Sequence, residues 1–190
     1  MKGIVFRAFE SYIDTRWPDS IADQMLSIES LSSQGSYTTV GYYPHTEFLA
    51  MAIHVAETTK TPINALVTDF GEKLFYNLAG AHPEMIKTYD TPIGLLSVIE
   101  NVIHRDVRKL YTNTELPRFD IVERDGNARI TMEYSSGRPF ADLAEGLIWG
   151  CLDFYRVKAR SSVIRTDVTS DGTHSIFKVK VHNERKNPTE

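Results

Sequence analysis

The chain has 190 residues, of which 42% are hydrophobic and 24% charged, with a net charge of −4 and a single cysteine. These values are typical of one globular domain whose core is large enough to border a pocket. The acidic balance argues against a nucleic-acid-binding protein, which usually presents a basic face. No apolar run reaches the ~18 residues of a membrane span, so we expect no membrane contact. The lone Cys151 can form no internal disulfide, which indicates a reduced, cytoplasmic compartment.

The N-terminal part of the chain carries one-sided apolar patterns that predict helices. The first three helices are expected over residues 2–16, 19–31 and 44–59. Asp19 is the predicted cap of the second helix. The segment between the second and third helices, residues 32–43, is predicted to be a loop with some β character.

Two further helices are predicted to begin in the same way. Thr61-Pro62 and Thr91-Pro92 each place a capping hydroxyl before a proline at the first helical position. The second of these helices is expected to continue to about residue 111. Its apolar side consists of Leu96, Ile99, Ile103, Val107 and Leu110. His104 points about 100° away from that side, so it faces either solvent or something other than the main core.

The C-terminal part changes to the period of β-strands. Two extended hairpins are expected, one turning at Asp125-Gly126 and one near Asp171-Gly172. A helix over residues 139–155 lies between them, and residues 183–190 form a polar tail. The predicted fold class is α+β, with helices on a four-stranded antiparallel sheet.

Two groups of residues carry chemistry. If residues 134–138 are extended, Tyr134, Ser136 and Arg138 leave the same face and offer donors to a carboxylate or phosphate. The spacing alone favours the solvated face of an edge strand, because alternation is the default for half-buried strands. His104 is a candidate ligand for haem iron or zinc, or else an ordinary surface histidine. A haem would use both groups, because its iron takes an imidazole and its propionates take cationic and hydroxyl donors.

The sequence resembles the haem-nitric oxide/oxygen-binding (H-NOX) family, which includes the haem domain of soluble guanylate cyclase. The resemblance covers nearly the whole chain and lies in MKGIVF (1–6), TDFGEKLF (68–75), IHRDVRKLY (103–111), LPRF (116–119), YSSGRPF (134–140) and AEGLIWG (144–150). It implies one domain over residues 1–182, with a distal helical part to about residue 60, a proximal part with the sheet from about residue 61, and haem b buried between them.

The resemblance also implies the roles of individual residues. His104 is the proximal iron ligand, and Tyr134, Ser136 and Arg138 hold the propionates. Pro117 presses on the porphyrin and helps to bend it. Phe9, Leu74 and Leu143 occupy distal positions of the haem pocket, and Val5 and Leu147 are further haem-binding residues.

A gas preference follows from that pocket. Leu143 stands where oxygen-binding members of the family have a tyrosine, and neither Phe9 nor Leu74 is a donor. We therefore expect a sensor that binds NO and CO but forms no stable complex with O₂. NO would weaken or break the iron–His104 bond, and the change would be read by a separate histidine kinase or cyclic-di-GMP enzyme.

Other functions are less well supported by the sequence. Glu100 and His104 could begin a non-haem metal site, but a hydrolase needs further ligands. A haem-free interaction domain would have no use for the row from Tyr134 to Arg138. We see no nucleophile–base pair, phosphate loop or catalytic carboxylate pair, so we expect no enzyme. Asp142 and Glu145 are expected to be solvated or capping residues.

Overall fold

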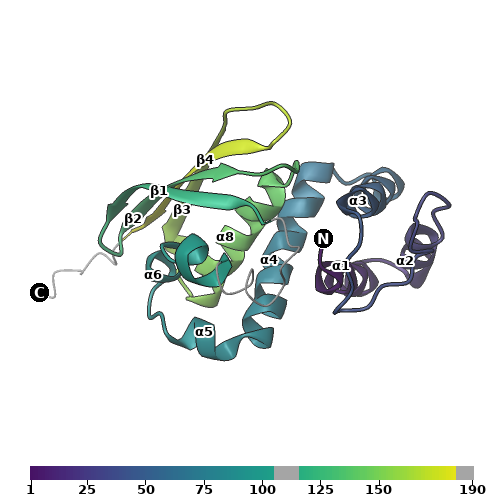
Figure 1. The fold of residues 1–190 in the computed structure, drawn as a ribbon, viewed down its shortest axis with the longest axis horizontal. Helices are drawn as coiled ribbons and strands as arrows, with labels where there is room; N and C mark the ends of the chain where they lie inside the picture. Colours follow the sequence, from purple (N-terminus) through teal and green to yellow (C-terminus); the bar gives the residue numbers. More distant parts are fainter. Residues whose placement is uncertain (105–115, 183–190) are drawn as a thin grey trace, which may run out of the picture.

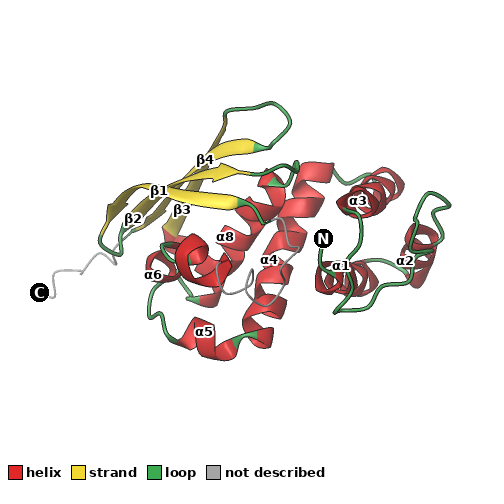
Figure 2. Cartoon of the chain, in the orientation of Figure 1, coloured by secondary structure: helices red, strands yellow, loops and turns green. Residues whose placement is uncertain are grey.

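A computed structural model describes residues 1–104 and 116–182, and its four-stranded sheet lies over a layer of helices. Figure 1 shows the long helix α4 standing between two parts of the molecule: the sheet with its helices on one side, and α1, α2 and α3 on the other. Figure 2 shows that the second part is built of helices and loops without a strand of the sheet. This arrangement confirms the α+β class.

The elements follow in chain order. They are α1 (Gly3–Arg16), α2 (Asp19–Leu26), α3 (His45–Thr59), α4 (Ile63–Ala81), α5 (Pro83–Lys87), α6 (Pro92–Leu96), the π-helix η1 (Ile99–His104), β1 (Arg118–Asp125), β2 (Arg129–Ser135), α8 (Ala141–Phe154), the 3₁₀ helix η2 (Lys158–Arg160), β3 (Ser161–Asp167) and β4 (His174–Val181). Within residues 1–104 and 116–182, no helix has both the length and the apolar character needed to cross a bilayer.

The sheet has the strand order β1-β2-β4-β3, with every neighbouring pair antiparallel. Both predicted turns are present, and Gly126 (φ 51°) and Gly172 (φ 69°) supply their left-handed backbone conformations. In β4, Phe177 and Val179 are buried while Lys178 and Lys180 are exposed, as the alternation of residues predicts. The two hairpins therefore pair through β2 and β4, which lie at the centre of the sheet.

The helix starts differ in part from the predictions. Thr91 caps α6, because its Oγ1 accepts a hydrogen bond from the Gly94 N–H at 3.1 Å. The same prediction at Thr61 is wrong, since Pro62 occupies the cap position of α4 and makes no side-chain cap bond. Asp19 is the first helical residue rather than the cap of α2. Its charge still lies where the helix dipole favours an acid.

The helix expected from residue 91 to about 111 is not continuous. α6 ends at Leu96, and His104 is the last residue of the separate π-helix η1. The wider turn of a π-helix changes which side chains share a face. The apolar spacing of a regular α-helix therefore does not predict the direction of His104. Val107 and Leu110 lie outside the described residues.

Buried side chains form two apolar clusters. The first, here called the N-terminal cluster, joins α1, α2, α3, α4 as far as Leu74, and the start of α8 with Leu143. The second, the sheet cluster, joins the end of α4, α6, α8 and the inner faces of β2 and β4. Leu74 of α4 belongs to the first cluster and Phe75 to the second, while Leu147 of α8 packs against both. The boundary between the two clusters therefore runs along α4 and α8.

α4 and α8 approach each other closely because both carry glycines at the contact. A methyl group on Gly146 would overlap the Thr68 carbonyl and lie 2.8 Å from the Gly71 Cα. A methyl group on Gly150 would lie 2.6 Å from the Phe75 Cβ. These contacts leave no room for a larger residue, and they fix the two helices that separate the clusters.

Candidate functional site

His104 faces the first strand of the sheet. Its side chain is only 13% exposed, and its Nδ1 lies 3.0 Å from Glu100 Oε2. Its ring lies 5.9 Å from the ring of Phe119, with an interplanar angle of 48°. The sequence left open whether His104 faces solvent or the protein. Its low exposure shows that it faces the protein.

Phe119 links His104 to Tyr134. Phe119 and Tyr134 are paired across β1 and β2, and their rings lie 5.2 Å apart. The Phe119 N–H also donates to Glu100 Oε2 at 3.4 Å. Pro117, two residues earlier, is partly buried. The histidine and the tyrosine thus lie against the same phenylalanine ring, although 29 residues of sequence separate them.

The row Tyr134, Ser136 and Arg138 gathers, but not as a continuous strand. β2 ends at Ser135, and the chain then turns, with the Arg138 N–H donating to Ser136 Oγ at 3.1 Å. The expectation of extended backbone to Arg138 is therefore wrong. The alternative of a solvated edge strand is also wrong, because β2 lies between β1 and β4 and Tyr134 is 1% exposed.

Ser136 and Arg138 both act on the Tyr134 hydroxyl. Burial raises the pKa of Tyr134, while a hydrogen bond with Ser136 and the charge of Arg138 oppose that rise. The hydroxyl therefore stays protonated at neutral pH and can donate a hydrogen bond. The Nε atom of Arg138 is buried, so its cation would meet a carboxylate with little screening by water.

The apolar residues expected to bind haem, three of them at distal positions, lie around one apolar region. Phe9, Leu74 and Leu143 are members of the N-terminal cluster and are 0%, 2% and 8% exposed. Val5 of α1 and Leu147 of α8 pack against the same cluster. None of these side chains can donate a hydrogen bond. The arrangement offers a dry, apolar wall to a ligand.

Three tyrosines of the same cluster point their hydroxyls elsewhere. Tyr12 donates to Asp69 at 3.2 Å, and Tyr37 donates to Glu47 at 2.8 Å. The Tyr43 hydroxyl accepts from the Thr38 N–H at 2.8 Å. Each of these three hydroxyls thus has a hydrogen-bond partner of its own.

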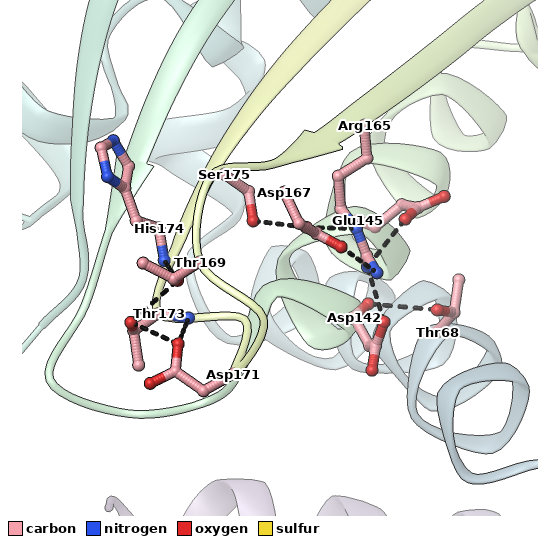
Figure 3. A network of polar contacts seen from close by, with 10 residues as sticks. All are labelled: Thr68, Asp142, Glu145, Arg165, Asp167, Thr169, Asp171, Thr173, His174 and Ser175. Atoms are coloured by element: carbon pink, nitrogen blue, oxygen red, sulfur yellow. Dashed lines mark hydrogen bonds and ion pairs between the residues drawn. The ribbon is translucent and has the colours of Figure 1, made fainter.

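α8, which carries Leu143 and Leu147, is joined to β3 by an arginine. Figure 3 shows the Arg165 guanidinium among carboxylates from both elements. It lies 2.5 Å from Asp142, 3.1 Å from Glu145 and 2.9 Å from Asp167. Asp142 and Glu145 are therefore partly exposed, as expected, but neither is the cap of α8, and both are held in ion pairs that the sequence did not predict. Burial opposes the charge of Arg165, but these acids raise its pKa.

A small polar cavity lies beside this ion-pair network. Its volume is about 130 Å³, and its walls include Pro139, Asp142, Arg165 and Asp171. Pockets for small organic ligands are roughly 300–1,000 Å³ and mostly apolar. This cavity is smaller than such pockets, and neither His104 nor Tyr134 is among its lining residues.

The residues around His104 and Tyr134 fit a haem by their donor chemistry. A neutral imidazole is an axial ligand for iron, and hydroxyl and guanidinium donors match two propionates. Across the part of the chain that the structure describes, no three His, Cys, Asp or Glu side chains gather as ligands for a lone metal ion. Glu100 and His104 are adjacent, but two side chains are too few to make such a site.

Comparison with known proteins agrees with this fit. The family model described as haem-NO-binding matches residues 2–163. No curated protein matches the chain. The solved structure of the Fe(II) unliganded H-NOX protein from K. algicida is 29% identical, with a TM-score of 0.90 over 97% of this chain and 98% of that one.

Two Shewanella structures were determined with a gas bound. The S. oneidensis H-NOX protein in the Fe(II)NO ligation state is 26% identical, with a TM-score of 0.83 over 96% of this chain and all of that one. The Shewanella woodyi H-NOX in the Fe(II)CO ligation state is 35% identical, with a TM-score of 0.80 over 100% and 99%. The chain described here belongs to the haem-NO-binding, or H-NOX, family.

Proposed function

We propose that this chain is a haem-based gas sensor, with His104 on the iron of haem b and Tyr134, Ser136 and Arg138 on its propionates. The observation that carries the proposal is the Phe119 ring, which lies between His104 and Tyr134 and contacts both. Pro117 would press on the porphyrin from the start of β1. Residues 1–60 would form the distal part and residues 61–182 the proximal part.

The apolar wall supports a preference for NO and CO over O₂. Iron-bound O₂ is strongly polar and gains from a hydrogen-bond donor, whereas NO and CO depend on one much less. Phe9, Leu74 and Leu143 offer no donor, and the Tyr12 hydroxyl is engaged by Asp69. The H-NOX proteins from S. oneidensis and S. woodyi are named as NO-ligated and CO-ligated forms, which supports the same ligands here.

The signal would begin at His104. When bound, a ferrous haem would supply an iron that His104 holds and that takes NO or CO, and NO would weaken or break the hold of His104 on that iron. His104 ends η1, so its release would let η1 shift relative to β1. The site then has two states whose balance the ligand changes, which is the requirement for allosteric signalling.

The output would be read by a separate protein. By family resemblance we propose a histidine kinase or a cyclic-di-GMP enzyme in trans. We assign the chain itself no catalytic step. Its role would be to bind a gas and change the position of the helices around α4 and α8.

Absorption spectra of the reduced, haem-loaded protein test this function. Under argon we expect a high-spin ferrous spectrum that changes with NO and with CO. On exposure to air, we expect no stable oxy spectrum and slow oxidation of the iron instead. A lasting oxy spectrum, or a protein that takes up no haem, would contradict the proposal.

A further inference from the structure

We propose that Glu100 is a positioning residue for His104. In this role it selects which imidazole nitrogen is available to iron, and it ties the histidine to the first strand of the sheet. The inference rests on the proposed function, since it assumes that His104 is the iron ligand.

The first step concerns the proton of the imidazole. Glu100 Oε2 lies 3.0 Å from His104 Nδ1, a normal hydrogen-bond distance. An ionised carboxylate can only accept, so opposite an ionised Glu100 the donor would be Nδ1, which would carry the proton. In the neutral imidazole, Nε2 then holds the lone pair. Glu100 would thus leave Nε2, and not Nδ1, available to bind a metal.

The second step concerns the orientation of the ring. The same oxygen, Glu100 Oε2, also accepts the Phe119 N–H at 3.4 Å. The carboxylate therefore bridges η1 and β1, and the Phe119 ring packs against the imidazole at 5.9 Å. Both side chains of the pair are largely shielded, with His104 13% and Glu100 20% exposed. A hydrogen bond in such surroundings is stronger than one in water.

The third step concerns the strength of the iron bond. A carboxylate that accepts from the far nitrogen makes a ligating histidine a better electron donor, and loss of such a partner typically costs 10- to 100-fold in metal affinity. Glu100 would therefore strengthen the bond that NO must break. By this reasoning the residue sets how readily His104 is released, without touching iron or gas.

The molecule contains a matched control for this pair. His174 Nε2 lies 2.6 Å from Glu133 Oε1, so the same two groups meet again on the sheet. Glu133 stands between the buried Met132 and Tyr134 and so faces away from the sheet cluster. That pair is also more exposed, at 33% and 44%. Its loss should leave haem binding unchanged.

The test compares Glu100→Gln, Glu100→Ala, Glu133→Gln and His104→Gly in the haem-loaded, reduced protein. The readouts are the iron–histidine stretching frequency from resonance Raman spectra and the affinity for haem. We expect E100A to lower the frequency and to weaken haem binding about 10-fold. E100Q keeps an accepting oxygen without the charge, so its shift should be smaller. E133Q should match the unmodified protein.

Two results would separate failure of this role from failure of the proposed function. An unchanged frequency in both E100A and E100Q, with the band lost in H104G, would show that His104 binds iron without help from Glu100. An unchanged band in H104G would overturn the function itself and the role of Glu100 with it. Because E100Q is isosteric, it gives a reading even if E100A fails to fold.

Discussion

The aromatic rings of Phe119 and Tyr134 lie 5.2 Å apart across the paired strands β1 and β2. Because Phe119 also contacts His104, this pairing brings the proposed iron ligand and a proposed propionate-binding residue to the same ring. A shift of one residue in the strand register would move Phe119 to the opposite face of the sheet and separate the two ends of the site. The irregularity between Ile121 and Glu123 lies beyond Phe119, so the register around the site is regular.

A donor introduced at Leu143 should change the gas preference. Leu143 lies in the N-terminal cluster and is 8% exposed, so a tyrosine there would place a hydroxyl in an otherwise apolar region. We expect Leu143→Tyr to give a stable oxy spectrum in air. Leu143→Phe, which adds the ring without the hydroxyl, is the matched control and should give none. Equal behaviour of the two variants would mean that this position does not govern O₂ binding.

Loss of the guanidinium at Arg138 should weaken haem binding. A hydrogen bond to a charged group contributes about 1.5–3 kcal/mol, so Arg138→Gln should lower haem affinity roughly 10- to 100-fold. The control is Arg129→Gln, since Arg129 is exposed and pairs with Glu123 on the far end of the hairpin. Titration of the apoprotein with haemin measures both. If R138Q bound haemin as tightly as R129Q, Arg138 would not hold a propionate.

Alanine should have opposite effects on stability at two glycines, one at the close contact of α4 with α8 and one with open space around it. Gly146→Ala should reduce the free energy of unfolding by about 3 kcal/mol or more, because its methyl group would meet backbone atoms that cannot move aside. Gly80 lies in α4 with no atom within 4 Å of an added methyl group. Gly80→Ala should therefore stabilise the protein by about 0.4–1 kcal/mol. Urea unfolding of the two variants gives both values.

Glu47 should make the stability depend on pH. Its carboxylate is 4% exposed. Burial opposes its ionisation, yet hydrogen bonds from Ser32, Ser33 and Tyr37 outweigh burial and lower its pKa. The folded state is therefore stabilised above the ordinary Glu pKa of about 4.3, and this contribution is lost as the pH falls through the lower folded-state pKa.

The corresponding experiment compares Glu47→Gln with Glu57→Gln on the exposed side of the same helix. At pH 7, E47Q should lose about 1–3 kcal/mol of unfolding free energy, because an amide cannot accept all of these hydrogen bonds. The difference from the unmodified protein should shrink at acid pH. A difference that stays constant between pH 7 and pH 3 would contradict the predicted pKa.

The sequence predicts local features of this fold well. The turns at Gly126 and Gly172 follow from the residue types that left-handed backbone requires, and the alternation in β4 follows from one buried face. The pairing of β2 with β4 could not be predicted in the same way. It joins residues about 45 positions apart, and no local pattern specifies that contact.

The site shows the same limit. The donor types at His104, Tyr134 and Arg138 are visible in the sequence, and family resemblance assigns their roles. The break between α6 and η1 is not visible, because the apolar spacing fits one continuous helix equally well. Nor does spacing reveal that Glu100 faces His104 and Phe119 at once, or that Arg165 pairs with acids of α8.

The most direct test of the central idea is the spectrum of His104→Gly in the reduced, haem-loaded protein under argon. If His104 is the iron ligand, the ferrous spectrum of the variant should differ from that of the unmodified protein, and added imidazole should restore it. His82→Gly, at an exposed histidine after α4, should change nothing. A ferrous spectrum of H104G that matches the unmodified protein without imidazole would place the iron ligand elsewhere and contradict the account.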